Sequence, residues 1–225
     1  MRFQDAARDA RAVVYAGIQA DPLVAQAAEL LTTATLGQRI LARAVMNGET
    51  TDPGAWRIMF PRLFDAAGAD DRQRAVSEAI LSAALAVADR GEQVRSQVRG
   101  ALVEELTARL LARRAGAAVV RRERRILFDG VRAEIHPYDV TVERESAPEA
   151  YDCKWGARGI NADVLYQLDD ARTHASDEDG RLVVGLVVFD AARSCQVRLD
   201  AQTAPHEATW LVSLDELDAL AERPA

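Results

Sequence analysis

The apolar run 182–189, with the sequence LVVGLVVF, constrains the fold of this chain more than any other segment. Its eight positions carry no charged side chain. A short, uninterrupted apolar run that is rich in β-branched residues is typical of a strand with both faces buried. The run therefore predicts a strand inside a sheet that is covered on both sides.

The residues around this run alternate between helix and strand signals. We expect a helix at 92–114, strands at 117–128, 131–142 and 149–155, and a helix at 161–174. Asp129-Gly130 marks a hairpin turn between the first two strands. Short strands at 196–199 and 209–212 follow the run, and a capping-box pattern formed by Ser213 and Glu216 predicts a last helix.

The first 90 residues have a different pattern, because their apolar residues recur at helical spacing. We expect helices at 3–19, 23–31, 36–45, 55–66 and 69–90, the fourth interrupted by Pro61. The sequence thus predicts an all-helical bundle at 1–90, followed by an α/β (α+β) domain at 91–225 that begins near Gly91. The bundle is expected to act as a partner, sensor or dimerisation module.

Cysteine and histidine spacing excludes several classes of site. Cys153 and Cys195 form neither a disulfide framework nor a Cys-x-x-Cys metal pair. His136, His174 and His206 lack zinc-site spacing, so we expect surface or structural roles for them. No apolar run approaches the roughly 20 residues of a membrane span, and the polar first residues lack a signal-peptide pattern. We expect a cytoplasmic protein without a membrane partner.

The charge is unevenly distributed along the chain. The formal net charge is −7, and residues 134–225 hold 19 acidic against 8 basic residues, yet eight arginines lie within 109–132. A basic segment in an acidic chain favours a local surface that faces phosphate, although a solvated, salt-bridged face is the alternative. The arginines expected to contact phosphate are Arg113, Arg114, Arg121, Arg122, Arg124 and Arg125.

The segment 149–155 carries a charged pair inside an otherwise apolar strand. Asp152 and Lys154 are two residues apart, so both side chains leave the same face, while Tyr151, Cys153 and Trp155 occupy the other face. Two charged groups on a half-buried strand require partners. A hard cation such as Mg²⁺, bound by carboxylate oxygens, would supply one.

Lys154 is the single lysine beside 27 arginines. A composition that selects arginine wherever either cation serves indicates that this position needs a compact ammonium, which the planar guanidinium group cannot replace. The alternative is a strand salt bridge between Lys154 and either Asp139 or Asp152.

Two short motifs carry a family resemblance. Pro137-Tyr138-Asp139 is followed by Tyr151-Asp152-Cys153-Lys154, and this order resembles the PD-(D/E)xK nuclease superfamily over about residues 92–190. Tyr138 is an insertion between the proline and the aspartate of the family pattern. The resemblance implies a restriction-endonuclease-like αβββαβ core with a central mixed sheet. It also implies that Asp139 and Asp152 bind Mg²⁺ or Mn²⁺ and that Lys154 is the catalytic lysine.

Many members of this superfamily add a glutamate from the preceding helix, and Glu104 and Glu105 compete for that role. Glu104 borders the buried stripe of its helix whereas Glu105 points towards solvent, so we expect Glu104 to be the third catalytic and metal-binding acid. The resemblance also implies supporting roles beside the site for Gln167 and Asn161.

These features predict a Mg²⁺- or Mn²⁺-dependent endonuclease, a phosphodiester hydrolase that cuts DNA in phage defence, restriction or repair. RNA cleavage is one alternative. Another is an inactive subunit that uses the same fold as a scaffold or nucleic-acid-binding module. A homodimer is expected from the family resemblance. A protein partner is expected at residues 1–90 or at the acidic C-terminal region.

Overall fold

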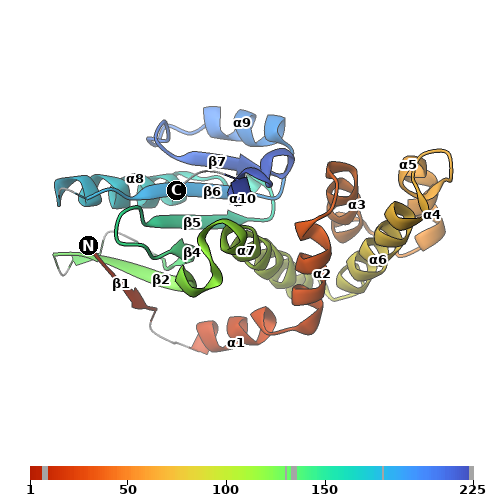
Figure 1. Ribbon diagram of the computed structural model, residues 1–225, viewed down its shortest axis with the longest axis horizontal. Coiled ribbons are helices and arrows are strands. Elements are labelled where there is room, and N and C mark those ends of the chain that lie inside the picture. The colour runs from red at the N-terminus through yellow and green to blue at the C-terminus, as the bar shows by residue number, and fades with distance from the viewer. Residues whose placement is uncertain (7–9, 130, 133–135, 179, 223–225) are drawn as a thin grey trace. The chain divides into compact units, whose positions relative to one another are not determined.

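The computed structural model describes residues 1–6, 10–129, 131–132, 136–178 and 180–222 (Figure 1). It has a mixed α/β fold that divides into two compact units. The sheet unit comprises Met1–Asp9 and Thr107–Ala225, and the helical unit comprises Ala10–Leu106. The division falls inside the helix α7 (Glu92–Ala115) and not near Gly91, because one uninterrupted helix contributes residues to both units.

The helical unit contains six helices before α7. They are α1 (Ala10–Gln19), α2 (Pro22–Thr32), α3 (Leu36–Asn47), α4 (Pro53–Met59), α5 (Pro61–Phe64) and α6 (Asp71–Ala88). Local signals set their ends: Asp21 caps α2 with Pro22 in its first turn, and Thr35 and Gln38 form a capping box at α3. Pro61 separates α4 from α5, as its sequence position predicts.

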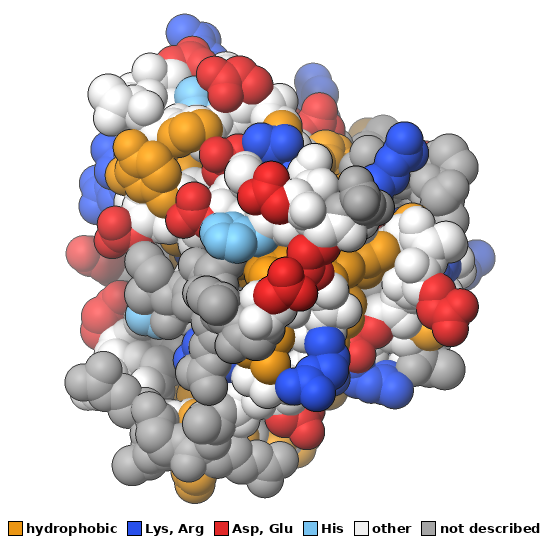
Figure 2. Space-filling view, turned by 90° about the vertical axis from the view of Figure 1, so that its left-hand side faces the viewer, with side chains coloured by type: hydrophobic (Ala, Val, Ile, Leu, Met, Phe, Trp, Pro, Cys, Tyr) orange, Lys and Arg blue, Asp and Glu red, His pale blue; other side chains and the backbone are white. Residues whose placement is uncertain are grey.

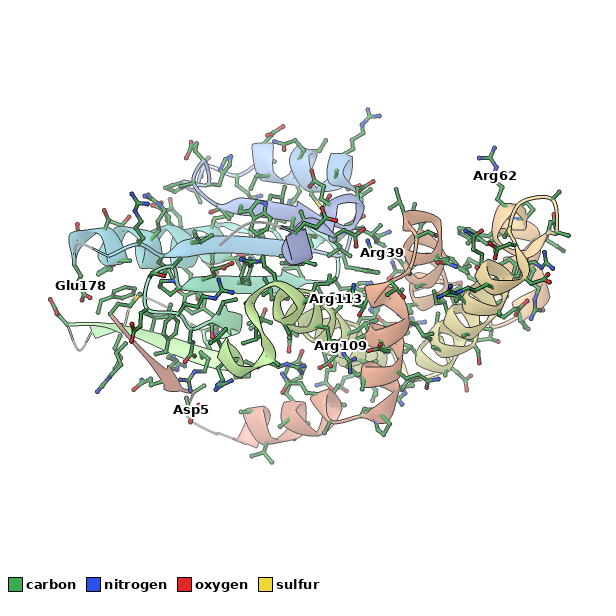
Figure 3. All side chains as sticks on the ribbon, viewed as in Figure 1. Asp5, Arg39, Arg62, Arg109, Arg113 and Glu178 are labelled. Atoms are coloured by element: carbon green, nitrogen blue, oxygen red, sulfur yellow. The ribbon has the colours of Figure 1, made fainter. Side chains whose placement is uncertain are left out.

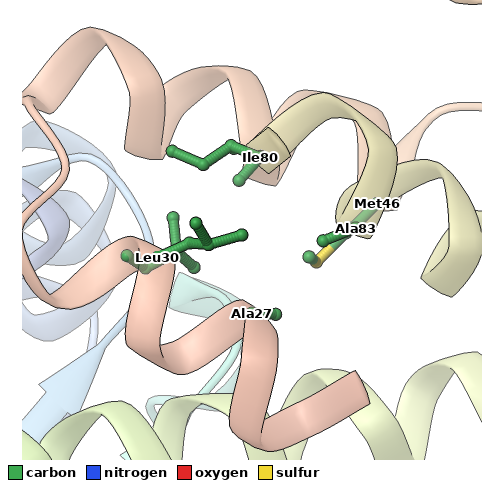
Figure 4. A pocket seen from close by; sticks show the side chains of 7 residues that line it. Ala27, Leu30, Met46, Ile80 and Ala83 are labelled. Carbon is green, nitrogen blue, oxygen red and sulfur yellow. The ribbon is translucent and has the colours of Figure 1, made fainter. Parts of the chain in front are cut away.

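The core of the helical unit is mostly apolar and also buries the polar side chains of Gln38, Arg39 and Ser77. Figure 4 shows side chains from α2, α3 and α6, including Ala27, Met46 and Ile80, around a gap in this core. The gap has no room for a water-sized molecule. It is therefore a small irregularity of packing and offers no ligand site.

The sheet unit is built on one mixed sheet. Its strands are β1 (Arg2–Asp5), β2 (Val120–Phe128), β3 (Val131–Arg132), β4 (Tyr138–Val142), β5 (Glu149–Lys154), β6 (Val183–Val188) and β7 (Trp210–Ser213). The order across the sheet is β1-β2-β4-β5-β6-β7, with β3 paired to β2 (Figure 1). The pairs from β1 to β5 are antiparallel, whereas β5/β6 and β6/β7 are parallel.

The apolar run lies where its composition predicts, because β6 pairs with β5 on one side and β7 on the other. Residues of α8 (Ala162–Asp177) and α9 (Ala192–Asp200) join β6 in one buried cluster. Ala150 of β5 belongs to this cluster, whereas Cys153 contacts Thr107 of α7, with 3.5 Å between Sγ and Oγ1. The two faces of β5 are thus covered by different helices, as period-two alternation requires.

Several expected elements match the structure. The helix expected at 92–114 is α7, the strand expected at 149–155 is β5, and the helix expected at 161–174 is α8. The hairpin is also present, since Phe128 of β2 pairs with Val131 of β3. The single strand expected at 131–142 is replaced by β3 (Val131–Arg132) and β4 (Tyr138–Val142), with His136 and Pro137 in neither; residues 133–135 lie outside the described residues. After β7, Ser213 donates to Glu216, and a 3-10 turn (Leu214–Glu216) precedes α10 (Ala219–Glu222).

Two expected elements are wrong. The helix expected at 3–19 begins only at Ala10, and residues 2–5 form β1, which pairs with β2 with Phe3 opposite Ile126. The strand expected at 196–199 is part of the helix α9, whose Cys195 and Leu199 are buried one turn apart. Among the described residues, no helix has the length and apolar character that a membrane crossing requires.

Candidate active site

A pocket of about 350 Å³ lies within the sheet unit, where β4, β5 and α8 meet. Its lining residues are His136, Pro137, Asp139, Asp152, Lys154, Asn161, Asp163, Val164 and Gln167. Five residues that the sequence singles out, the two aspartates, the lysine, Asn161 and Gln167, therefore line one pocket. A pocket of this size matches the smaller ligand sites of proteins.

The strand pairing explains why the two aspartates converge. Val140 of β4 lies opposite Tyr151 of β5, and Asp139 and Asp152 are the residues directly beside this pair on the two strands. Facing residues of antiparallel strands are about 5 Å apart. The α8 helix begins eight residues after Lys154, so its first turns close the same end of the sheet.

Lys154 and Asp152 form an ion pair in the pocket, and the Asp152 side chain is 9% exposed. Burial by itself lowers the pKa of Lys154, but the carboxylates of Asp152 and Asp139 outweigh it, so that the pKa is raised. The ammonium is therefore protonated over the whole physiological range. It supplies a positive charge and hydrogen-bond donors to the pocket.

Asp139 is held by the neighbouring strand. Its Oδ2 atom accepts a 2.6 Å hydrogen bond from the main-chain N–H of Cys153. A carboxylate oriented by a main-chain donor keeps its direction when solvent or a ligand exchanges beside it. The β5 strand thus fixes Asp139 and also supplies Asp152 and Lys154.

Gly159 provides the space that the lysine side chain occupies. A Cβ atom at this position would lie 2.9 Å from both Cβ and Cγ of Lys154, too close for carbon atoms in contact. Gly159 lies in the short 3-10 turn Ala157–Gly159 between β5 and α8. Its importance is not visible in the sequence, because this role depends on how the turn folds back over β5.

Glu123 is a second residue that the sequence argument missed. It lies on β2 with φ of 50°, in the left-handed region that non-glycine residues rarely adopt. One of its carboxylate oxygens lies within 4.8 Å of an Asp139 carboxylate oxygen. In the sequence, Glu123 is a single acidic residue between two pairs of arginines, which distinguishes it from its neighbours. The surrounding positive charge, however, predicted a basic strand.

The side-chain amide of Gln167 is hydrogen-bonded to main chain in the pocket wall. Its Oε1 accepts from the N–H of His136 at 3.0 Å, and its Nε2 donates to the carbonyl of His136 at 3.1 Å. Asn161 is the N-cap of α8, with its side-chain oxygen accepting from Val164 N–H at 3.1 Å. Both residues thus organise the pocket wall.

Glu104, the expected third acid, belongs to the helical unit. It is buried and accepts hydrogen bonds from the hydroxyl of Tyr15 and, at 2.8 Å, from the amide of Gln19. Glu105 is partly exposed. Glu104, expected at the border of the buried stripe, is thus the more buried of the two glutamates, and its role as a metal ligand stays a prediction.

Two of the arginines expected to contact phosphate are engaged within the protein. Arg114 makes two 2.8 Å hydrogen bonds to the Glu149 carboxylate, and its side chain is 7% exposed. Arg124 pairs with Glu143 and Asp5. Both arginines thus have acidic partners within the protein, and their contact with phosphate stays a prediction.

The other four expected arginines differ in exposure. Arg113, labelled on α7 in Figure 3, and Arg121 on β2 are exposed, whereas Arg122 and Arg125 are partly buried. Figure 2 shows acidic and basic side chains intermixed over the face drawn there. A phosphate contact from this group therefore depends on Arg113 and Arg121 more than on an extended basic surface.

Comparison of the chain with protein-family models, curated proteins and solved structures finds no match.

Proposed function

We propose that this protein is a divalent-metal-dependent nuclease that hydrolyses phosphodiester bonds of DNA. The observation that carries the proposal is the convergence of Asp139, Asp152 and Lys154 on one pocket. Asp139 lies on β4, 13 positions before Asp152 and 15 before Lys154 on β5, so local structure alone does not bring it to the other two residues. Two carboxylates can hold a divalent cation, and an ammonium can offset the charge that develops on the phosphate, both of which serve metal-assisted phosphodiester hydrolysis.

The order of elements supports the restriction-endonuclease-like core as part of this proposal. The helix α7 is followed by β2, β4 and β5, then by α8 and β6, with the short β3 between β2 and β4. This is the αβββαβ order that the sequence resemblance implies, on a sheet that combines antiparallel and parallel pairs.

The donor set of the pocket fits Mg²⁺ or Mn²⁺. Such cations prefer carboxylate oxygens and retain positions for water and phosphate, and the pocket offers Asp139 and Asp152 with Asp163 at its lining. When bound, the cation would polarise the phosphodiester and lower the pKa of a water molecule. Lys154 contributes a fixed positive charge against the negative charge that develops on the phosphate oxygens.

The direct test is cleavage of plasmid, single-stranded DNA and RNA by the purified protein with Mg²⁺, Mn²⁺ or EDTA. We expect metal-dependent DNA cleavage that Asp139→Asn, Asp152→Asn and Lys154→Met each lower by at least about 100-fold, the scale of losing one electrostatic group. Asp200→Asn, an exposed aspartate on α9 outside the pocket, is the matched control and should retain full activity.

A scaffold role is the second candidate, and the Lys154–Asp152 ion pair is the observation that favours it. If the pair is purely structural, the wild-type protein cuts none of these substrates, and Lys154→Met lowers the melting temperature. A nuclease instead gives metal-dependent cleavage by the wild type, which Lys154→Met lowers whatever its melting temperature. Preferential cleavage of RNA would reassign the substrate while leaving the chemistry unchanged.

A further inference from the structure

The mouth of the pocket carries a histidine whose main chain is unusually well held. His136 lines the pocket together with Asp139, Asp152 and Lys154, and its side chain is exposed. The buried carboxamide of Gln167 binds both the N–H and the carbonyl of His136, at 3.0 and 3.1 Å. Such a paired contact fixes the main chain as a neighbouring strand would.

Two further contacts restrict the same segment. The hydroxyl of Tyr138 donates to the main-chain carbonyl of Gln167 at 3.3 Å, so both sides of Pro137 are tied to one turn of α8. Pro137 fixes its own φ angle and limits the backbone of His136. The direction in which the imidazole leaves the main chain is therefore set before any ligand binds.

The other nitrogen donors of the pocket are engaged within the protein. Lys154 donates to Asp152, Gln167 donates to His136, and the amide of Asn161 faces the carbonyl of Gly159 at 3.4 Å. Within the described part of the chain, the imidazole of His136 makes no hydrogen bond, although it lines the pocket. It is the side chain best placed to donate an N–H to an incoming anion.

We propose that His136 binds a non-bridging phosphate oxygen of the nucleic-acid backbone at the pocket, and that Gln167 is the positioning residue that holds it. This inference rests on the proposed nuclease function and adds a substrate contact to it. The lining contains three aspartates and one lysine, so an approaching phosphodiester needs donors beyond the cation. His136 acts in binding and is separate from the groups that hold the metal.

The kinetic test compares the wild-type protein with His136→Ala, His136→Gln and His206→Asn on a fluorescent DNA duplex. We expect His136→Ala to raise KM about tenfold with little change in kcat, the size of one hydrogen bond to a charged group. His136→Gln keeps an N–H donor and should recover part of the loss. His206 lies outside the pocket, so His206→Asn should have the same KM and kcat as the wild type.

Gln167 is tested by non-additivity. If it acts through His136, Gln167→Leu raises KM, and the double variant with His136→Ala has no larger KM than His136→Ala alone. Additive effects on KM would overturn the positioning role. Should Gln167→Leu fail to fold, Gln167→Glu replaces it, because glutamate accepts from the His136 N–H but, when ionised, cannot donate to the His136 carbonyl.

A second readout separates this inference from the nuclease proposal. The imidazole ¹H–¹⁵N resonances of the three histidines, assigned with His136→Gln, are followed while the duplex is added with Ca²⁺ in place of Mg²⁺. A shift confined to His136 supports the contact even if the protein proves unable to cleave. Active wild-type protein with an unchanged KM in His136→Ala, or an unmoved His136 resonance on duplex addition, overturns the contact and leaves the nuclease proposal intact.

Discussion

Gly159 shows how much of the pocket depends on a residue that carries no chemistry. Its missing side chain leaves the volume through which the stem of Lys154 passes. Gly156, three residues earlier, offers a matched comparison, because a Cβ there would meet its nearest atom, Oδ2 of Asp190, at an ordinary 3.5 Å. Alanine variants at the two glycines therefore distinguish crowding of Lys154 from a general effect of substitution in the turn.

We expect Gly159→Ala to lower kcat by at least about tenfold, because even a displacement of about 1 Å of a catalytic group is costly. Gly156→Ala should leave kcat near the wild-type value. Steady-state cleavage assays measure the difference, and thermal melts of both variants report on folding. Equal kcat values for the two variants would mean that Lys154 accommodates the extra methyl group.

The identity of the cation at position 154 gives a second residue-scale prediction. Lys154→Arg keeps the positive charge but replaces the compact ammonium by the larger, planar guanidinium group, and the side chain at this position is closely packed against Gly159. We expect a loss of activity close to that of Lys154→Met, measured by the same cleavage assay. The reverse exchange, Arg193→Lys, at an exposed residue of α9 outside the pocket, should leave activity nearly unchanged. A fully active Lys154→Arg protein would contradict the need for a compact ammonium.

Sequence reasoning succeeded at the residue scale where the signal was local. The period of two on β5 placed Asp152 and Lys154 on one face, and the ion pair between them agrees with that placement. Glu123 and Gly159 were missed because their importance arises from a left-handed backbone and a turn, which no pattern of residue types reveals. Gln167 was found, but its partner, the His136 main chain, was not.

At the scale of elements, β6 was predictable and α9 was not. The run LVVGLVVF has one interpretation that suits its length and composition, and it forms β6. The segment 196–199 alternates over only four residues, too few to distinguish a strand from a helix. The helical spacing of Cys195 and Leu199, both buried in α9, was the better signal.

Pairing between β5 and β6 depends on a close contact at Gly185. This residue lies opposite Tyr151, and a Cβ there would lie 2.5 Å from Cδ1 and Cε1 of the Tyr151 ring. The aromatic ring fills the volume that a side chain at Gly185 would need. Parallel strands have no hairpin to fix their register, so this fit selects the pairing that also carries Lys154 opposite Val188.

We expect Gly185→Ala to destabilise the protein by about 1–3 kcal/mol, the cost of overpacking a buried contact. Urea unfolding of the variant and the wild type measures this difference in the free energy of unfolding. The double variant Gly185→Ala with Tyr151→Leu removes the ring and should recover part of the loss. An unchanged midpoint for Gly185→Ala alone would show that Tyr151 moves aside freely.

Across the sheet unit as a whole, Arg114 joins three distant segments. It reaches from α7 to Glu149 on β5 and donates from Nε to the carbonyl of Leu220 on α10 at 3.0 Å. Tyr151 also donates to Glu149. Burial alone raises the pKa of Glu149, but the hydrogen bonds from Arg114 and Tyr151 outweigh it, and the pKa is lowered from its usual value of 4.5.

A lowered carboxyl pKa makes stability depend on pH in one direction. The stabilisation is present above about pH 4.5, the unfolded value, and is lost as pH falls through the lower folded value. We expect Glu149→Gln to be about 3 kcal/mol less stable than the wild type at pH 7, because Arg114 loses its buried partner. The difference should shrink below pH 4.5; urea midpoints between pH 3 and 7 test this, and a constant gap would contradict it.

The domain arrangement was predictable only in outline. Composition separated a helical front from a mixed rear, but it gave no sign that β1 belongs to the sheet. An isolated four-residue strand carries little local pattern, and its partner β2 lies more than a hundred residues along the chain. The extension of α7 across the division was equally hidden, since helical periodicity does not change there.

The pairing of β1 with β2 also determines when the sheet can be completed during translation. Translation produces residues 2–5 before the helical unit and residues 120–128 after it. At the usual pace of synthesis the earlier strand waits on the order of ten seconds for its partner. During that interval Ile126, the residue that pairs with Phe3, has not been synthesised, so the unpaired segment can bind the edge strands of other proteins or chaperones. Completion of the sheet is therefore a late event in the production of this protein.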